Sequence, residues 1–274
     1  MLRQAMHSKQ ALAGLVLILL MGGMAVFASV LMPHDPNQIE VSRKFLPSSW
    51  EYPLGTDQLG RCVLSRLICG ARYSLGIAIP TLLVLGAAGI AVGTAAAYLG
   101  GWPERLMLIV CDIFMAFPPL VIVLSMIGAL GQGIANILAA VVFSMWAWFA
   151  KVVRTYAAIE KNKDYITAAK IAGCSNLRII CYHIIPNIWG PFIVYMSTGV
   201  ASLILMISGF SFLGLGFPAG TPEWGAMLGE ARSVFYSHPR LVLYPGLFIL
   251  LTAAGFNLFG EALRDILSPE EASQ

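Results

Sequence analysis

The residues that could bind a metal ion are few and lie far apart in the sequence. The four histidines are His7, His34, His183 and His238. A nickel or copper site needs several imidazole, thiolate or carboxylate ligands at one place, and no matching set of carboxylates accompanies these histidines. We therefore expect no metal site, and we interpret each histidine as a surface or interfacial residue.

The cysteines do not form a zinc or redox motif. There is no CxxC pair and no His/Cys spacing that suits zinc. Cys62 and Cys69 fall on a segment expected outside the membrane and could pair, but seven residues apart on one helix we expect them to stay separate. We interpret all five as small apolar residues of membrane helices: Cys62, Cys69, Cys111, Cys174 and Cys181.

Sequence motifs for catalysis and for nucleic-acid binding are also missing. The chain has no P-loop, no GxSxG and no HExxH, and its basic residues form no stripe interleaved with aromatics. We expect no catalytic residue, no bound cofactor and no nucleic-acid partner.

Asp112 is an acid at the edge of an otherwise apolar run. An acid inside a membrane span is costly and is functional by default. Asp112 sits near one end of its run, however, so helix capping or an ion pair with Arg105 or Arg154 competes with a role in a transport pathway. We favour the structural role.

The segment 164–174 combines charge with small residues. Tyr165, Ala168, Ala169 and Ala172 fall at positions i, i+3, i+4 and i+7, so they share one face of a helix. Gly173 suits the end of such a helix. A face of small side chains fits docking into a partner's groove, but a solvated connecting loop fits this pattern equally well.

A second helix is expected directly after Gly173. Ser175 or Asn176 can cap it, and residues 177–185 would lead the chain back to the membrane. Pro186 should mark a bend where the next membrane helix begins.

The composition of the chain indicates an integral membrane protein. Of the 274 residues, 58% are hydrophobic and 11% are charged, whereas soluble domains carry about 25% charged residues.

The apolar runs predict the membrane spans. A span needs about 20 mostly apolar residues. The first apolar run is longer than a signal-peptide core and lacks a clear A-x-A site, so we expect it to be retained. We predict six spans, at about 11–32, 73–99, 106–127, 132–150, 179–213 and 241–260.

The distribution of Lys and Arg predicts the orientation. With the N-terminus inside, ten of these residues lie in the cytoplasm and seven lie outside. Six of the ten are concentrated in the connection 151–178, and both termini are then cytoplasmic. The longer outer connections are 33–72 and 213–240.

Each outer connection contains a short helical pattern. In the first, Leu59, Cys62, Val63, Leu67 and Gly70 form an apolar stripe opposite a polar face. We expect an amphipathic helix at the outer interface, with a hydrated polar face made of Arg61, Ser65 and Arg66. The second connection could form a partial lid over the outer mouth.

The segment 164–186 resembles the cytoplasmic motif of ABC-importer permeases, whose usual form is E-A-A-x-x-x-G followed by I-x-x-P. Ala168, Ala169, Gly173 and Pro186 match it, and Ile184 or Ile185 supplies an isoleucine before the proline. Thr167 stands where the family commonly has Glu, so a salt bridge from that position to an ATPase is not expected here.

Other blocks are similar to the second permease subunit of the dipeptide, oligopeptide and nickel branch. They occur in the family's order: HDPN at 34–37, LGTDQLGRCVLSRLICGARYSL at 54–75, FMAFP at 114–118, FSFLGLG at 210–216, TPEWGAML at 221–228 and FNLFGEALRD at 256–265. This resemblance covers nearly the whole chain.

The resemblance implies an all-α type I ABC-importer permease in the bacterial inner membrane, with a coupling helix at about 164–174. Its domains would be an N-terminal helix with the external amphipathic segment (1–72), the permease domain (73–264) and a cytoplasmic tail (265–274). The implied ATPase-docking residues are Tyr165, Ala168, Ala169, Ala172 and Gly173.

The resemblance also implies the partners. They are a second homologous permease, two cytoplasmic ATPase subunits that use the ATP, an extracytoplasmic substrate-binding protein and the lipid bilayer.

The substrate is indicated by two further blocks. SMWAWFAKVVR at 144–154 and the D-x-F-M-x-F-P form at 112–118 resemble the nickel permeases, so we expect nickel or a nickel chelate as substrate. Short peptides are the alternative, and a secondary transporter or a membrane scaffold are more distant ones.

Overall fold

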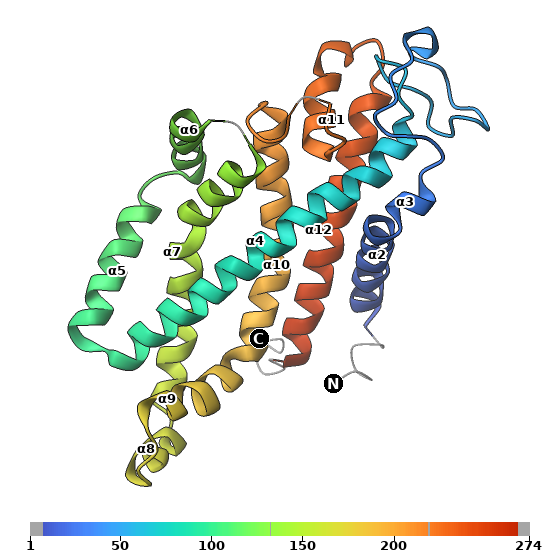
Figure 1. The fold of residues 1–274 in the computed structure, drawn as a ribbon. Helices are drawn as coiled ribbons and strands as arrows, with labels where there is room; N and C mark the ends of the chain where they lie inside the picture. The colour runs from blue at the N-terminus through green and yellow to red at the C-terminus, as the bar shows by residue number, and fades with distance from the viewer. Residues whose placement is uncertain (1–7, 132, 219, 268–274) are drawn as a thin grey trace.

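The computed structural model describes residues 8–267, except residues 132 and 219, and this part of the chain is a bundle of helices (Figure 1). The α-helices are α2 Lys9–Val26, α3 Ala28–Leu31, α4 Val63–Leu99, α5 Gly101–Met115, α6 Pro119–Leu130, α7 Ile134–Lys161, α8 Asp164–Ile171, α9 Asn176–Ile179, α10 Ile185–Phe212, α11 Trp224–Ala231 and α12 Arg240–Leu267. Shorter turns are Val41–Arg43 and Arg232–Val234, which are 3-10, and Ile180–Ile184, which is π-helical.

The membrane-spanning character of the fold is confirmed. Five helical stretches among the described residues are long and apolar enough to cross a membrane: α2, α4, α7, the continuous run from α9 to α10, and α12. Helices α5 and α6 pass the same test together, but they are bent by 79° relative to each other. They form either a broken sixth span or a re-entrant loop.

The break between α5 and α6 differs from the single helix predicted over 106–127. Helix α5 ends at Met115 and α6 begins at Pro119. Pro118 and Pro119 explain the break, because a proline lacks the backbone N–H that a helix interior needs and disfavours helical backbone in the residue before it.

Helix α4 corrects the prediction of a separate amphipathic helix at the outer interface. It runs for 37 residues without interruption, about 55 Å at 1.5 Å per residue, and crosses the bundle obliquely (Figure 1). The face that we expected to be hydrated, made of Arg61, Ser65 and Arg66, is at most 2% exposed. Charged groups can be buried only when they are paired, and the partners of the two arginines, Asp57 nearby and Glu230 far along the chain, are described below.

Helix α11, in the connection 213–240, is packed as a wedge among α4, α10 and α12 rather than lying as a loose lid. Trp224 is fully buried, and its indole Nε1 donates a hydrogen bond to the carbonyl oxygen of Leu67 at 3.0 Å. Glu223, also fully buried, caps α11 by accepting from the Ala226 N–H at 2.9 Å. Its other oxygen accepts from the Ser74 hydroxyl of α4 at 3.0 Å.

The run from α9 to α10 contains the expected irregularity near Pro186. In the π-helical turn, the N–H of Ile185 reaches back five residues to the carbonyl of Ile180. Pro186 has no N–H to offer, and its ring would crowd the carbonyl four residues earlier in a tight α-helix. The wider π turn accommodates the proline directly before α10 begins its course through the bundle.

Candidate functional site: the helix α8 and its anchors

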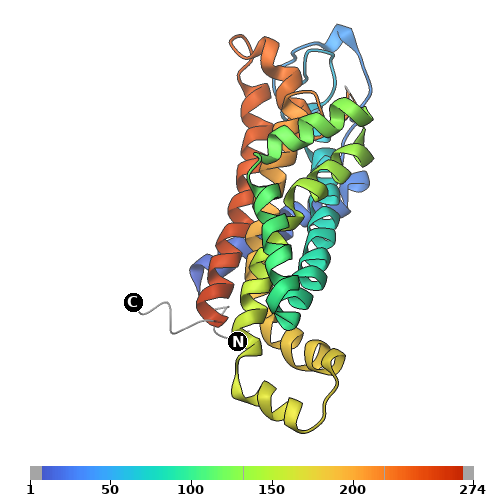
Figure 2. The same cartoon turned by 90° about the vertical axis from the view of Figure 1, so that its left-hand side faces the viewer.

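Helices α8 and α9 form a hairpin that extends from one end of the bundle, and α11 lies at the opposite end (Figures 1 and 2). We refer to these as the α8 end and the α11 end. The hairpin follows directly from the C-terminal end of α7.

The end of α8 is set by a glycine, as the sequence predicts. Gly173 has a φ of +80°, a left-handed conformation that favours glycine. The Gly173 N–H bonds to the carbonyl of Lys170 at 3.0 Å, and the Cys174 N–H bonds to the carbonyl of Ala169 at 3.1 Å. This pair of bonds is the Schellman motif, and it turns the chain sharply after Ala172.

The start of α9 is capped by Ser175, one of the two predicted capping residues. Its hydroxyl oxygen accepts a hydrogen bond from the Arg178 N–H at 3.4 Å. Asn176, the other candidate, instead uses its side-chain oxygen to accept from the Tyr98 hydroxyl at 2.7 Å. The cap therefore leaves Asn176 available to join α9 to the end of α4.

One side of α8 is fixed to the bundle by apolar packing. Ile166 is fully buried in a cluster, and Ala169 packs against the edge of the same cluster. The buried members come from α4, α7, α8, α9, the π turn and α10: Ala97, Tyr98, Val153, Ala157, Ile166, Ile179, Ile184, Ile188 and Phe192. Full burial of an isoleucine stabilises a fold by about 1.5–3 kcal/mol, so α8 is attached rather than loosely tethered.

A hydrogen bond ties the start of α8 to α7. The Tyr165 hydroxyl donates to a carboxylate oxygen of Glu160, which is 6% exposed, and Lys163 pairs with the other oxygen at 2.8 Å. Burial and the bond to Glu160 raise the pKa of Tyr165 to about 12. The phenol therefore stays protonated, and able to donate to Glu160, to a higher pH than an ordinary tyrosine would.

Tyr98, at the C-terminal end of α4, contacts three segments of this region. Besides its bond to Asn176, its ring lies under the ammonium groups of Lys161 and Lys170, at 5.9 and 5.5 Å from the ring centre. The Lys161 ammonium also donates to the carbonyl of Ala97 at 2.9 Å. It thereby satisfies one of the carbonyls that the end of α4 leaves without a helical partner.

The other side of α8 is open. Ala168, Ala172 and Gly173 are exposed, and Ile171 between them is 83% exposed. Of the five residues that the sequence singled out, these three share the open side, while Ala169 is half-buried and the Tyr165 hydroxyl is bound to Glu160.

Sequence reasoning missed four residues of this region: Tyr98, Glu160, Ile166 and Ile171. An isoleucine on each side of a short polar helix is a signal that could have marked Ile166 and Ile171. The periodicity of small residues alone does not tell which side of the helix packs against the bundle.

The ion pairs of α5 correct the prediction for Asp112. Its carboxylate pairs with the Lys151 ammonium at 2.6 Å, while Arg154, one of the two predicted partners, bonds to Glu104 with its Nε at 2.6 Å. Both pairs join α5 to α7. The predicted structural role of Asp112 fits this arrangement, but its partner lies three residues before Arg154, on the same side of α7.

No group of three or more potential metal ligands comes together among residues 8–267 that the structure describes. His34 stacks on Tyr52, and His238 stacks on Phe45. His183 lies near the Tyr165 ring, and His7 falls outside the described residues. In the same part of the chain the cysteines are free thiols.

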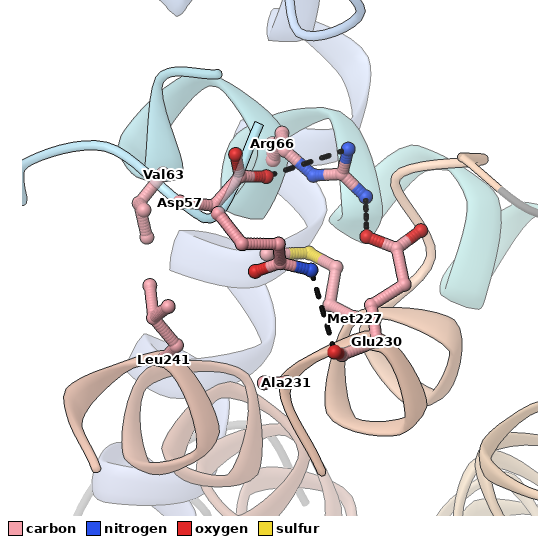
Figure 3. A pocket seen from close by; sticks show the side chains of 8 residues that line it. Asp57, Val63, Arg66, Met227, Glu230, Ala231 and Leu241 are labelled. Atoms are coloured by element: carbon pink, nitrogen blue, oxygen red, sulfur yellow. Dashed lines mark hydrogen bonds and ion pairs between the residues drawn. The ribbon is translucent and has the colours of Figure 1, made fainter. Parts of the chain in front are cut away.

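A second polar site lies at the α11 end (Figure 3). Arg61 pairs with Asp57 at 2.7 Å and with Glu230 at 2.5 Å, and Arg66 pairs with the same Glu230 oxygen at 3.1 Å. The other Glu230 oxygen accepts from the Gly220 N–H at 3.0 Å. Two carboxylates therefore neutralise two buried guanidinium groups, and the cluster joins the loop before α4 to α11.

Comparison with known families gives two matches. Residues 89–272 match the family described as binding-protein-dependent transport system inner membrane component. Residues 1–47 match the N-terminal transmembrane domain of oligopeptide transport permease C. The first match covers more than half of the chain.

Curated relatives are similar over nearly their whole length. The nickel transport system permease protein NikC of Escherichia coli is 33% identical over 93% of this chain and 92% of its own. The metal-staphylopine import system permease protein CntC of Staphylococcus aureus is 36% identical over 100% and 94%. The di/tripeptide transport system permease protein DppC of Pseudomonas aeruginosa is 38% identical over 96% and 89%.

Proposed function

The chain belongs to the inner-membrane components of binding-protein-dependent transport systems, and from this premise we propose that it forms half of the pathway for nickel or a nickel chelate. It is an ABC-importer permease of the peptide, nickel and metallophore branch, and not an enzyme. This membership replaces the secondary-transporter and scaffold alternatives.

The partners that we propose follow from this assignment. A second, homologous permease would complete the pathway, two ATPase subunits would bind at the α8 end, and a binding protein would deliver substrate at the α11 end. The α8 end and both termini would then be cytoplasmic, as the concentration of Lys and Arg in residues 151–178 favours. ATP would be used by the ATPase subunits alone.

The open side of α8 is the observation that supports ATPase docking. Ala168 and Ala172 allow close approach, and Ile171 offers an exposed apolar side chain that a groove in a partner would cover. Thr167, where relatives commonly carry Glu, is also exposed. Docking here would depend on shape and apolar contact rather than on an ion pair from that position.

Ala168→Arg tests this docking surface. The bulky charged side chain should block the groove, because an uncompensated clash at the centre of an interface costs about 2 kcal/mol or more. We expect ATPase co-purification and substrate uptake to fall about thirtyfold or more, with the permease still in the membrane.

The matched control is Asn162→Arg, which places the same side chain on an exposed residue before α8. It should leave ATPase binding intact. Normal ATPase binding by Ala168→Arg would refute docking at this surface.

The proposal of nickel as substrate is supported by the block at 144–154, which resembles the nickel permeases, and by similarity to a nickel permease and a metal-staphylopine permease. A comparably similar relative transports di- and tripeptides, so short peptides are the second candidate. The weak metal affinity expected of the described residues suits a pathway, since tight coordination would oppose release.

Uptake of two probes separates these candidates. Cells lacking this chain, and the same cells with the chain restored, are given radiolabelled nickel or a radiolabelled dipeptide. We expect restoration to raise nickel uptake and to leave dipeptide uptake unchanged. A rise in dipeptide uptake alone would show that the permease belongs to a peptide importer.

A further inference from the structure

Helix α8 is held by contacts that reach three separate membrane-spanning helices, and this arrangement has a mechanical consequence. An ATPase that moves α8 can move the pathway only through side chains that resist the displacement. The contacts of α8 and α9 with the rest of the chain therefore identify the route that the motion would take.

Besides the apolar packing of Ile166, α8 makes polar contacts to α7, and these lie at the start of α8. The Tyr165 hydroxyl donates to Glu160 near the end of α7, and the same oxygen lies 3.3 Å from the carbonyl oxygen of His183 in the π turn. Because Glu160 is 6% exposed, water competes poorly for its carboxylate. One phenol thus links α8 to α7 and to the turn that leads into α10.

The contacts to α4 converge on Tyr98, which is 9% exposed. Its hydroxyl donates to Asn176 of α9 at 2.7 Å, and its ring lies against the Lys170 ammonium of α8. Lys161 of α7 lies against the same ring and bonds to the Ala97 carbonyl. The end of α4 is therefore joined to both helices of the hairpin and to α7.

We infer that Tyr98 and the Tyr165–Glu160 pair transmit the movement of α8 to α4 and α7 during the transport cycle. These are positioning residues: they touch neither ATP nor substrate, and they fix α8 to the helices that must move with it. Packed helices can slide past one another in small shear movements, and hydrogen bonds between fixed partners oppose such sliding. This inference rests on the proposed docking of ATPase subunits at α8.

The two tyrosine hydroxyls make the inference testable without disturbing the packing. Tyr98→Phe and Tyr165→Phe each remove one oxygen and keep the ring, so the apolar cluster around Ile166 should remain. Tyr182→Phe is the matched control, because Tyr182 lies in the same region and its side chain is 75% exposed.

The measurement is substrate transported per ATP hydrolysed. The permease is reconstituted in lipid vesicles with its partner permease, ATPase subunits and binding protein, and both radiolabelled nickel and a radiolabelled dipeptide are supplied. Each tyrosine variant should retain ATPase binding and hydrolysis while the ratio falls about fivefold, the factor expected for one lost hydrogen bond. Tyr182→Phe should keep the wild-type ratio.

A merely structural role would change thermal stability or assembly and would leave this ratio unchanged. If both variants assemble normally and keep the wild-type ratio, the inference is wrong.

Ala168→Arg separates the two proposals. Suppose that it loses the ATPase subunits while the tyrosine variants keep the wild-type ratio: docking at α8 is then supported, and transmission through these residues is refuted. If Ala168→Arg keeps the subunits, the docking surface itself is misplaced.

Discussion

At the scale of single residues, the charged cluster at the α11 end shows how this apolar fold accepts two buried arginines. Arg61 and Arg66 share the Glu230 carboxylate, and Asp57 supplies the second negative charge. A buried ion pair adds little net stability, but removal of one partner strands the other charge. We therefore expect the fold to be destabilised when any one charged side chain at the centre of this cluster is removed.

Glu230→Gln tests this point. The change should lower the free energy of unfolding by about 3 kcal/mol, because two guanidinium groups that are at most 3% exposed lose their shared carboxylate. Thermal unfolding of the purified protein in detergent measures the effect.

The control for this variant is Glu51→Gln, whose carboxylate pairs with Arg43 at the surface. An exposed pair of this kind contributes less than about 1 kcal/mol. Equal stability of the two variants would contradict the buried-charge argument.

At the scale of elements, α11 packs closely against α4 and α10 because glycines lie at both contacts. A Cβ added at Gly225 would lie 2.2 Å from the carbonyl oxygen of Ser208 on α10, and one added at Gly70 would lie 2.5 Å from the Trp224 ring. Helix α11 can pack this closely against α4 and α10 only because both positions are glycine. The block TPEWGAML is thus a packing motif as well as a family signature.

Gly225→Ala should push α11 away from α10, because a backbone atom cannot yield to the new methyl group. We expect the free energy of unfolding to fall by about 2 kcal/mol or more. Gly209→Ala on α10 is the control: nothing lies within 4 Å of its added Cβ, and alanine favours a helix. Unfolding midpoints in detergent compare the two, and equal midpoints would argue against the wedge.

At the scale of the whole molecule, the two ends of the bundle carry different features. The α8 end presents an open helix backed by polar anchors, and the α11 end carries the buried charge cluster and the loops before α4 (Figure 1). The N-terminal end of α2 and the C-terminal end of α12 both point toward the α8 end (Figure 1). One orientation therefore places the α8 end and both of these helix ends on the same side of the membrane.

Labelling with a membrane-impermeant maleimide tests the orientation. In a variant without native cysteines, Trp50→Cys and Thr167→Cys place single thiols on exposed residues at opposite ends. In spheroplasts, we expect the thiol at position 50 to react at once and the thiol at position 167 to react only after lysis. The reverse order would place α8 outside the cell.

The sequence by itself determined the features that depend on local order. Apolar run lengths predicted the spans other than the bent pair α5 and α6. Gly173 and Ser175 predicted the end of α8 and the start of α9, and Pro186 predicted the irregularity before α10. Each depends on backbone preference or hydropathy within a few neighbouring residues. The ordered motif blocks likewise indicated the family before any contact was known.

Only the tertiary structure decided which distant groups meet. Arg66 and Glu230 are 164 residues apart, and Tyr98 and Asn176 are 78 apart. Arg66 was expected to be hydrated, since no spacing rule relates it to a carboxylate so far along the chain. The packing of Ile166 likewise decided which side of α8 remains open, because the shape of the neighbouring helices, rather than the pattern within α8, determines which face is covered.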